Sequence, residues 1–179
     1  MDHAKKYQDE DRIKIKELWV PAAIILEEGT SSGEGKVLRA EARHRLKGGN
    51  NILVFSKPER LKDWLKKEGL SLKKREHLIV SAGETVRTFS TEEDGLEVFA
   101  HAPFTADIDD EPGDEIDRND SALILHMSFK VENTLIKAIF ASDSTSGTWK
   151  DIVNVTEYYK NEDRLDWDIF KVGHHCSYK

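Results

Sequence analysis

The stretch Phe170-Lys171-Val172-Gly173-His174-His175-Cys176-Ser177 decides how this chain is interpreted. An apolar strand, predicted over Trp167–Val172, ends at a glycine, and two histidines follow at once. Glycine lets the backbone turn sharply, so the paired imidazoles can project into one site. Imidazole is a usual ligand of catalytic zinc, and the stretch therefore predicts a metal site at the end of a strand.

An earlier strand end carries a carboxylate. The apolar run Leu135–Phe140 predicts a strand that leads into Ala141-Ser142-Asp143-Ser144. A strand that delivers an aspartate at its tip places that side chain at the rim of a sheet, where functional residues often lie. The pair Asp2-His3 offers the same two kinds of ligand. Two metal ions about 3.5–4 Å apart can share such a carboxylate.

The order of the predicted elements indicates a layered α/β fold. Apolar runs predict strands, and segments with apolar residues three or four positions apart predict helices. The expected strands are Leu18–Val20, Ile52–Phe55, Glu84–Phe89, Leu96–His101, Ala122–Phe129, Leu135–Ala141 and Trp167–Val172. The strands Ala122–Phe129 and Leu135–Ala141 are expected to form a hairpin. The expected helices are Lys36–Lys47, with Val37, Leu38, Ala42 and Leu46 on one face, after a loop from Gly29 to Gly35; a segment from Pro58 to Gly69, with Leu61, Trp64 and Leu65 at helical spacing; and Trp149–Tyr159 with Ile152, Val153 and Val155 inside. Because there is no internal repeat, one domain over residues 1–179 is expected.

The region from Asn119 to Ser177 resembles the second half of a hydrolase of the metallo-β-lactamase fold, and it is closest to the branch that contains the hydrolase domain of the DNA-uptake competence protein ComEC. That branch has Asn-x-Ser before a strand, then a strand ending in Gly-Asp, a helix, and a strand ending in Gly-His-His-Gly-Ser. The chain has Asn119-Asp120-Ser121, Ser142-Asp143 and Gly173-His174-His175-Cys176-Ser177 in that order. Serine and cysteine each replace a glycine.

The resemblance implies an αββα sandwich of the metallo-β-lactamase type. The family also has an earlier His-x-His-x-Asp-His motif, of which only Asp2-His3 could be present. We therefore expect a partial domain, incomplete at its N-terminus, while its extent after Lys179 stays open.

The resemblance also implies a role for each matching residue of the second half. Asp143 would be a metal ligand that bridges two ions. Of the tandem pair, His175 is the expected ligand, and His174 is expected to stabilise developing charge, although the order within the pair stays open. His174 and Asp143 are thus the expected catalytic residues.

The remaining expected ligands come from earlier in the chain. Asp2 and His3 resemble ligands of the second metal. His101, at the end of the strand Leu96–His101, is the candidate for a further histidine from the middle of the domain. The resemblance implies zinc, two ions in a complete domain, with manganese as the alternative.

Other potentially reactive residues have simpler interpretations. His126 lies inside an apolar strand and is expected to be a core histidine with a hydrogen-bond partner. His44 and His77 lie among charges and should be solvated. Cys176 has no visible base–orienter arrangement for thiol catalysis. The acidic segment 107–120 lacks the regular spacing of a calcium loop and is expected to be a solvated loop, too polar for any core.

Composition narrows the classes of protein. The chain has 179 residues, a net charge of −7 and a single cysteine, which excludes an internal disulfide. It lacks a run of about 18 apolar residues, so no membrane span is expected, and without a signal peptide the expected location is cytoplasmic. The acidic balance argues against strong nonspecific binding of nucleic acid. It does not exclude a phosphodiester substrate at one metal-lined site.

Two functions from different classes remain. The first is a metal-dependent hydrolase in which a metal-bound hydroxide attacks an ester or phosphodiester, in nucleic acid or a nucleotide by resemblance. The alternative is a non-catalytic or inactive truncated module that acts through protein association. An incomplete domain would leave a sheet edge or face uncovered, which favours association. Residues 4–95 hold no chemical motif, and the oligomeric state is open.

Overall fold

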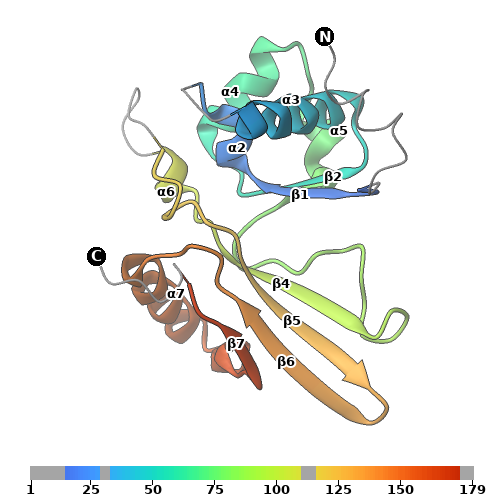
Figure 1. Ribbon diagram of the computed structural model, residues 1–179, viewed down its shortest axis with the longest axis vertical. Helices are drawn as coiled ribbons and strands as arrows, with labels where there is room; N and C mark the ends of the chain where they lie inside the picture. Colours follow the sequence, from blue (N-terminus) through green and yellow to red (C-terminus); the bar gives the residue numbers. More distant parts are fainter. Residues whose placement is uncertain (1–14, 29–32, 110–115, 174–179) are drawn as a thin grey trace.

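The computed structural model describes residues 15–28, 33–109 and 116–173. Within these ranges the chain forms two β-sheets with helices on their outer faces, so the fold is mixed α/β, as predicted (Figure 1). None of the helices in these ranges combines the length and the apolar character that crossing a bilayer would require.

The first sheet is parallel and comes from the N-terminal half of the chain. It contains β1 (Leu18–Pro21), β2 (Ile52–Phe55) and β3 (Ile79–Val80) in that order. Every residue of β2 is buried, as expected for a central strand covered on both faces. Parallel strands need long crossover connections, and helices supply them here. These connections contain α2 (Ala22–Leu26), α3 (Gly33–Gly48), α4 (Glu59–Lys67), α5 (Leu72–Arg75) and the 3-10 helix η1 (Glu76–Leu78).

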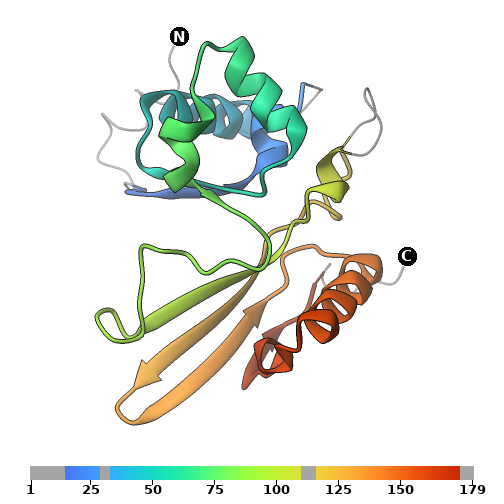
Figure 2. The ribbon, with the colours of Figure 1, turned by 180° about the vertical axis from the view of Figure 1, so that it is seen from behind.

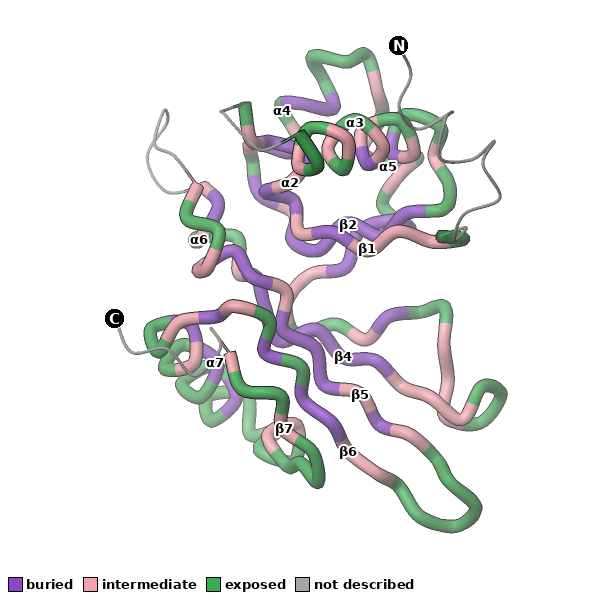
Figure 3. Tube along the Cα trace, in the orientation of Figure 1, coloured by how far each residue is buried: buried purple, intermediate pink, exposed green. Residues whose placement is uncertain are grey.

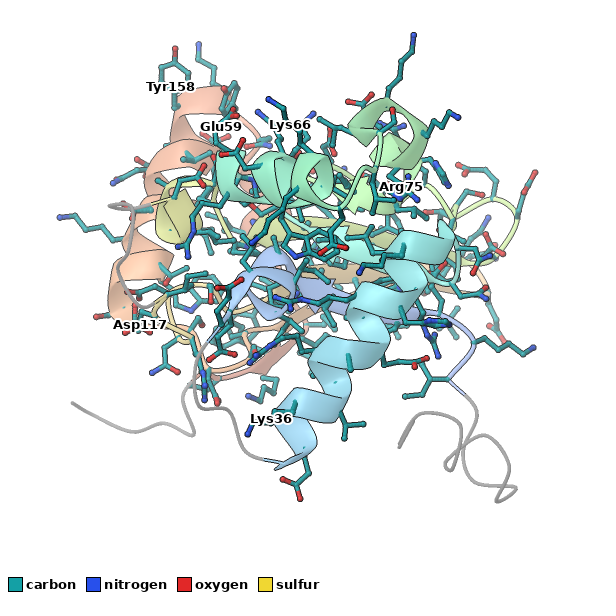
Figure 4. The ribbon with its side chains drawn as sticks, turned by 90° about the horizontal axis from the view of Figure 1, so that it is seen from above. Lys36, Glu59, Lys66, Arg75, Asp117 and Tyr158 are labelled. Carbon is teal, nitrogen blue, oxygen red and sulfur yellow. The ribbon has the colours of Figure 1, made fainter. Side chains whose placement is uncertain are left out.

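The helix α4 shows how the sequence builds the core between the helices and the first sheet. Leu61, Trp64 and Leu65 repeat at helical spacing, as predicted, and all three are buried. On the opposite side of this helical layer, Lys36 and Lys66 point outward (Figure 4). The layer is therefore apolar toward the sheet and charged toward solvent.

The helix α3 differs from its prediction in two respects. It begins at Gly33, inside the segment Gly29–Gly35 that was predicted as a loop, although residues 29–32 lie outside the described ranges. Ala42 and Leu46 are fully buried as predicted, but Leu38, expected on the same face, is exposed. The charged first turn of the helix lies away from the core.

The second sheet is mostly antiparallel. Its order is β4 (Leu96–Ala102), β5 (Ile124–Val131), β6 (Thr134–Phe140) and β7 (Ile169–Lys171), and only the β6–β7 pair is parallel. The predicted hairpin is confirmed as β5 and β6. The crossover to β7 contains α7 (Ser146–Tyr159) and the 3-10 helix η2 (Glu162–Leu165).

The segment predicted as a strand over Glu84–Phe89 is not a regular strand. Its first half nevertheless pairs with the outer edge of β4. The Val86 N–H donates to the Val98 carbonyl at 2.8 Å, and the Ala100 N–H donates to the Glu84 carbonyl at 3.0 Å. This edge of the second sheet is thereby covered.

Three apolar cores separate four layers. The first core lies between the helices and the first sheet, and the second lies between the two sheets, where Phe55 of β2 and Leu125 of β5 belong to one cluster. The third lies between the second sheet and α7 and includes Ile139 and Ile152. The layers follow the order helices, sheet, sheet, helix, which both views show (Figures 1 and 2).

Two local predictions were wrong. Of the three apolar residues predicted inside α7, Ile152 is buried, while Val153 and Val155 are exposed, because residues one and three positions further along turn away from the sheet. In the acidic segment, the short helix α6 (Ala106–Asp109) buries Ile108 in the first core. One apolar side chain is enough to anchor an otherwise polar loop.

Candidate functional site

The predicted motifs of the second half meet at one end of the second sheet. The parallel neighbours β6 and β7 have Phe140 opposite Lys171, so both strands finish at the same edge. The antiparallel β5 begins at that edge, because Leu125 lies opposite Phe140. The turn after β6, the residue Gly173 after β7, and the loop 119–121 before β5 therefore converge, although they are far apart in the sequence.

The turn after β6 carries Asp143. Ser142 adopts a left-handed backbone conformation with φ of 47°, and the Ser144 hydroxyl donates to the Ala141 carbonyl at 2.6 Å. A left-handed residue is most easily a glycine. The serine therefore occupies the position where the resembling family has glycine, and it keeps the backbone shape that a glycine would favour. Asp143 itself is half-buried.

The closest approach in this region is between Gly173 and the Asp143 turn. A Cβ atom on Gly173 would lie 2.7 Å from the Ser144 Oγ and 2.8 Å from the Ser144 carbonyl oxygen. Contacts this short exclude any side chain at position 173 unless the turn moves. The glycine of the predicted motif is thus required by packing. Gly173, which directly precedes His174 in the sequence, therefore packs against the Asp143 turn.

The loop before β5 is tied to the same turn by Asp120. The Thr145 hydroxyl donates to the Asp120 Oδ1 at 2.8 Å. Thr145 is also the N-cap of α7, since its Oγ1 accepts from the Thr148 N–H. The sequence did not predict this contact or the role of Thr145, although Asp120 lies inside the quoted Asn119–Ser121 motif. The spacing of a capping threonine three positions before Thr148 was the signal that could have located the start of α7 at Ser146.

His101 lies in a different environment from that expected of a ligand at this edge. Its side chain is buried, with 4% exposed, and its Nε2 donates to the Arg164 carbonyl of η2 at 3.0 Å. Burial lowers the pKa of His101 to about 4, and the Arg164 carbonyl opposes this shift only in part. The imidazole is therefore neutral at pH 7 and fastens η2 to the sheet, and we leave it out of the proposed site.

His126 makes a similar hydrogen bond to a backbone carbonyl. It is buried beside His101, with 6.2 Å between the ring centroids, and its Nε2 donates to the Asp166 carbonyl at 3.1 Å. Burial lowers its pKa as well. The prediction of a core histidine with a partner is confirmed. His44 and His77 are exposed, as expected.

The described residues hold only part of the predicted metal site. Among them there is no group of three or more His, Cys, Asp or Glu side chains that could hold a metal ion. Of the predicted ligands, Asp2, His3 and His175 lie outside the described residues, as do His174 and Cys176. Asp143 has a carboxylate, which is a usual metal ligand, and it lies at the sheet edge. The Nε2 of His101, in contrast, donates to the Arg164 carbonyl of η2.

A second surface feature lies beside β3. It is an open depression of about 370 Å³ with mainly charged and polar walls. Lys57 pairs with Glu76 at 3.2 Å, and Glu84 accepts from the Ser81 N–H at 2.8 Å. Because these charges are largely compensated within the protein, the depression is a weaker candidate than the edge of the second sheet.

Comparison of the chain with family models, with curated proteins and with solved structures gave no match.

Proposed function

We propose that the chain carries part of a metal-dependent hydrolase site at the end of β6 and β7. The packing of Gly173 against the Asp143 turn is the observation that supports this most directly. It brings Gly173, the one described residue of the second motif, against a turn about 30 residues earlier in the chain, which supports a site formed by both motifs. The layer order of helices, sheet, sheet and helix is compatible with the αββα sandwich of the metallo-β-lactamase type, which we propose as the fold family.

In this proposal each motif residue keeps the role implied by the resemblance. The Asp143 carboxylate and the His175 imidazole would hold the metal, together with Asp2 and His3. His174 donates a hydrogen bond to charge that develops on the substrate. When bound, zinc or manganese would activate water and polarise an ester or phosphodiester. The substrate class, a phosphodiester in nucleic acid or a nucleotide, rests on the resemblance, because a fold alone does not fix function.

The test compares metal content and hydrolysis in three variants of the whole chain. Metal is measured by elemental analysis after dialysis against zinc or manganese, and hydrolysis is measured with bis(p-nitrophenyl) phosphate. Asp143→Ala and His175→Ala should each lose metal and activity. Asp151→Ala, which removes an exposed carboxylate from the outer side of α7, should change neither. Unchanged metal and activity in both site variants would refute the proposal.

A second candidate is an association module without catalysis. The observation that favours it is an uncovered apolar face, because Phe140 and Ile169 are 41% and 58% exposed on the side of β6–β7 that faces the first sheet's layer. If the chain binds no metal and forms a stable dimer that Ile169→Lys dissociates, association replaces hydrolysis as the better account. A metal-free monomer would exclude both candidates.

A further inference from the structure

The charge of the chain is distributed unevenly. Residues 33–75, from the start of α3 to the end of α5, contain 13 Lys and Arg but only five Asp and Glu. This region has a formal net charge of +8, whereas the whole chain has −7. A strongly basic region in an acidic chain indicates a polyanionic partner for that region alone.

Several of these basic side chains serve the fold and are not available to a partner. Arg43 donates to the Ile25 carbonyl at 2.6 and 2.8 Å, and Arg75 donates to the Leu46 carbonyl at 2.7 Å. Lys47 pairs with Glu68 at 2.6 Å. These contacts fasten the helices to one another and to the first sheet, so the basic composition has a structural component.

Four exposed lysines have no such role. Lys66 and Lys67 end α4, Lys73 and Lys74 lie in α5, and none of their four ammonium groups forms an ion pair or hydrogen bond with a described residue. We call these four residues the lysine surface. Figure 4 looks down on it, with Lys66 on α4 and Arg75 marking the end of α5.

A helix dipole explains only half of the lysine surface. Cations near the C-terminus of a helix are stabilised by its dipole, which accounts for Lys66 and Lys67 in the last turn of α4. The helix α5 has four residues, too few for an appreciable dipole, yet it carries Lys73 and Lys74. Four like charges within nine positions repel one another, and an external polyanion would relieve that repulsion.

The surroundings of the lysine surface favour a nucleic acid over a membrane. None of the large hydrophobic side chains that are exposed in the structure lies within residues 57–75. Trp64 is buried against the core, so neither insertion into lipid nor stacking on bases has an aromatic side chain to use. The available chemistry is the pairing of ammonium groups with phosphates, which is independent of base sequence and sensitive to salt.

We propose that the lysine surface binds the phosphate backbone of a nucleic acid. The choice of nucleic acid rests on the proposed function, in which the sheet edge cleaves a phosphodiester. The helix α4 begins where Asp109 accepts from the Glu59 and Arg60 N–H groups and ends at the lysine surface. A polynucleotide, unlike a mononucleotide, is long enough to contact a surface remote from the sheet edge.

The experiment measures binding without catalysis. Fluorescence anisotropy of labelled single-stranded and duplex DNA of about 20 nucleotides is recorded in EDTA, from about 50 to about 200 mM salt. The test variant is Lys66→Glu/Lys67→Glu/Lys73→Glu. The control is Lys130→Glu/Lys150→Glu/Lys160→Glu, which makes the same change in net charge at exposed lysines of the other half of the chain.

The expected result is binding by the natural chain that weakens by roughly tenfold or more in the test variant, with a shallower dependence on salt, and stays near the natural value in the control. Absence of DNA binding at low salt, or equal weakening by the control, would overturn the proposal. Binding to phosphatidylserine vesicles in place of DNA would also overturn it. Because no metal is present, DNA binding through the lysine surface can stand even if the hydrolase proposal fails.

Discussion

The two halves of the second sheet differ in how the first sheet covers them. We call β4–β5 the covered half and β6–β7 the open half. Leu125 of β5 and Phe140 of β6 lie opposite each other and face the same way, yet Leu125 is 7% exposed and Phe140 is 41% exposed. Among the described residues, the core between the sheets includes side chains from β4 and β5 but none from β6 or β7. Figure 3 shows the change from buried to exposed along this sheet.

On the other face of the sheet the two halves differ in the polar residues that they carry. On this face β4 and β5 hold His101 and His126, which are both buried and donate to the carbonyl groups of Arg164 in η2 and of Asp166 just after it. The open half ends in Asp143 and Gly173, where the candidate chemistry lies. A histidine's role therefore follows from its burial and its partner, and the residue type alone does not reveal it.

The largest effect is expected in the covered half. Leu125→Ala should lower the free energy of unfolding by about 2–5 kcal/mol, because it leaves a cavity in the core between the sheets. Urea unfolding measures this change as a shift of the midpoint, provided that the dependence of the free energy of unfolding on urea concentration stays the same. A loss below about 1 kcal/mol would mean that the core between the sheets is less tightly packed than the burial of Leu125 indicates.

The buried histidine should make stability depend on pH. The pKa of His101 is about 4 in the folded chain and 6.5 in the unfolded chain, so only the unfolded state gains a proton as the pH falls from 6.5 toward 4. Stability should fall over this window, by up to about 3 kcal/mol from this residue. Unfolding measured at several pH values should show a weaker dependence in His101→Gln, which keeps an N–H donor for the Arg164 carbonyl.

The exposed His44 supplies the control for the pH experiment. His44→Gln replaces an exposed histidine on the outer side of α3 in the same way and tests whether any histidine substitution changes the dependence of stability on pH. If His101→Gln and His44→Gln have the same effect, His101 is not the buried neutral group that the structure describes.

Gly173→Ala should have an intermediate effect in the open half. The added methyl group would overlap the Ser144 Oγ and carbonyl oxygen, and relieving that overlap should cost about 1–3 kcal/mol. If the Asp143 turn moves to relieve the overlap, the affinity of the site for metal should also fall. Gly147→Ala in α7 is the matched control, because its Cβ would meet only the Thr145 Oγ1, at 3.5 Å. Thermal unfolding with and without zinc compares the two variants.

The smallest effect is expected for Phe140→Ala. Since its side chain is 41% exposed and outside the core between the sheets, the loss should be under about 1 kcal/mol. Measurement at two protein concentrations separates folding from association. A loss as large as that of Leu125→Ala, growing with protein concentration, would show that another chain covers the β6–β7 face.

The sequence predicted elements better than their environments. The helix α4 and the β5–β6 hairpin were found correctly, because their apolar spacing reflects contacts with near neighbours. The last strand was predicted from an apolar run, which is typical of a buried strand, but Ile169 is 58% exposed, since such a run does not reveal which strands the other sheet covers. The candidate site was only half predictable for the same reason. The carboxylate and glycine motifs stand in the sequence, but the Asp120–Thr145 hydrogen bond joins two separate loops.

By itself, the sequence determined the α/β class, the order of the longer strands and helices, and the position of a glycine between the last strand and the tandem histidines. These follow from local periodicity and from short motifs. Only the tertiary structure decided that Gly173 packs on the Asp143 turn, that His101 binds η2, and that unpaired lysines gather at the end of α4 and in α5. The reason is physical: these features depend on which distant segments share a sheet edge, a buried face or an open surface, and spacing along the chain does not encode that.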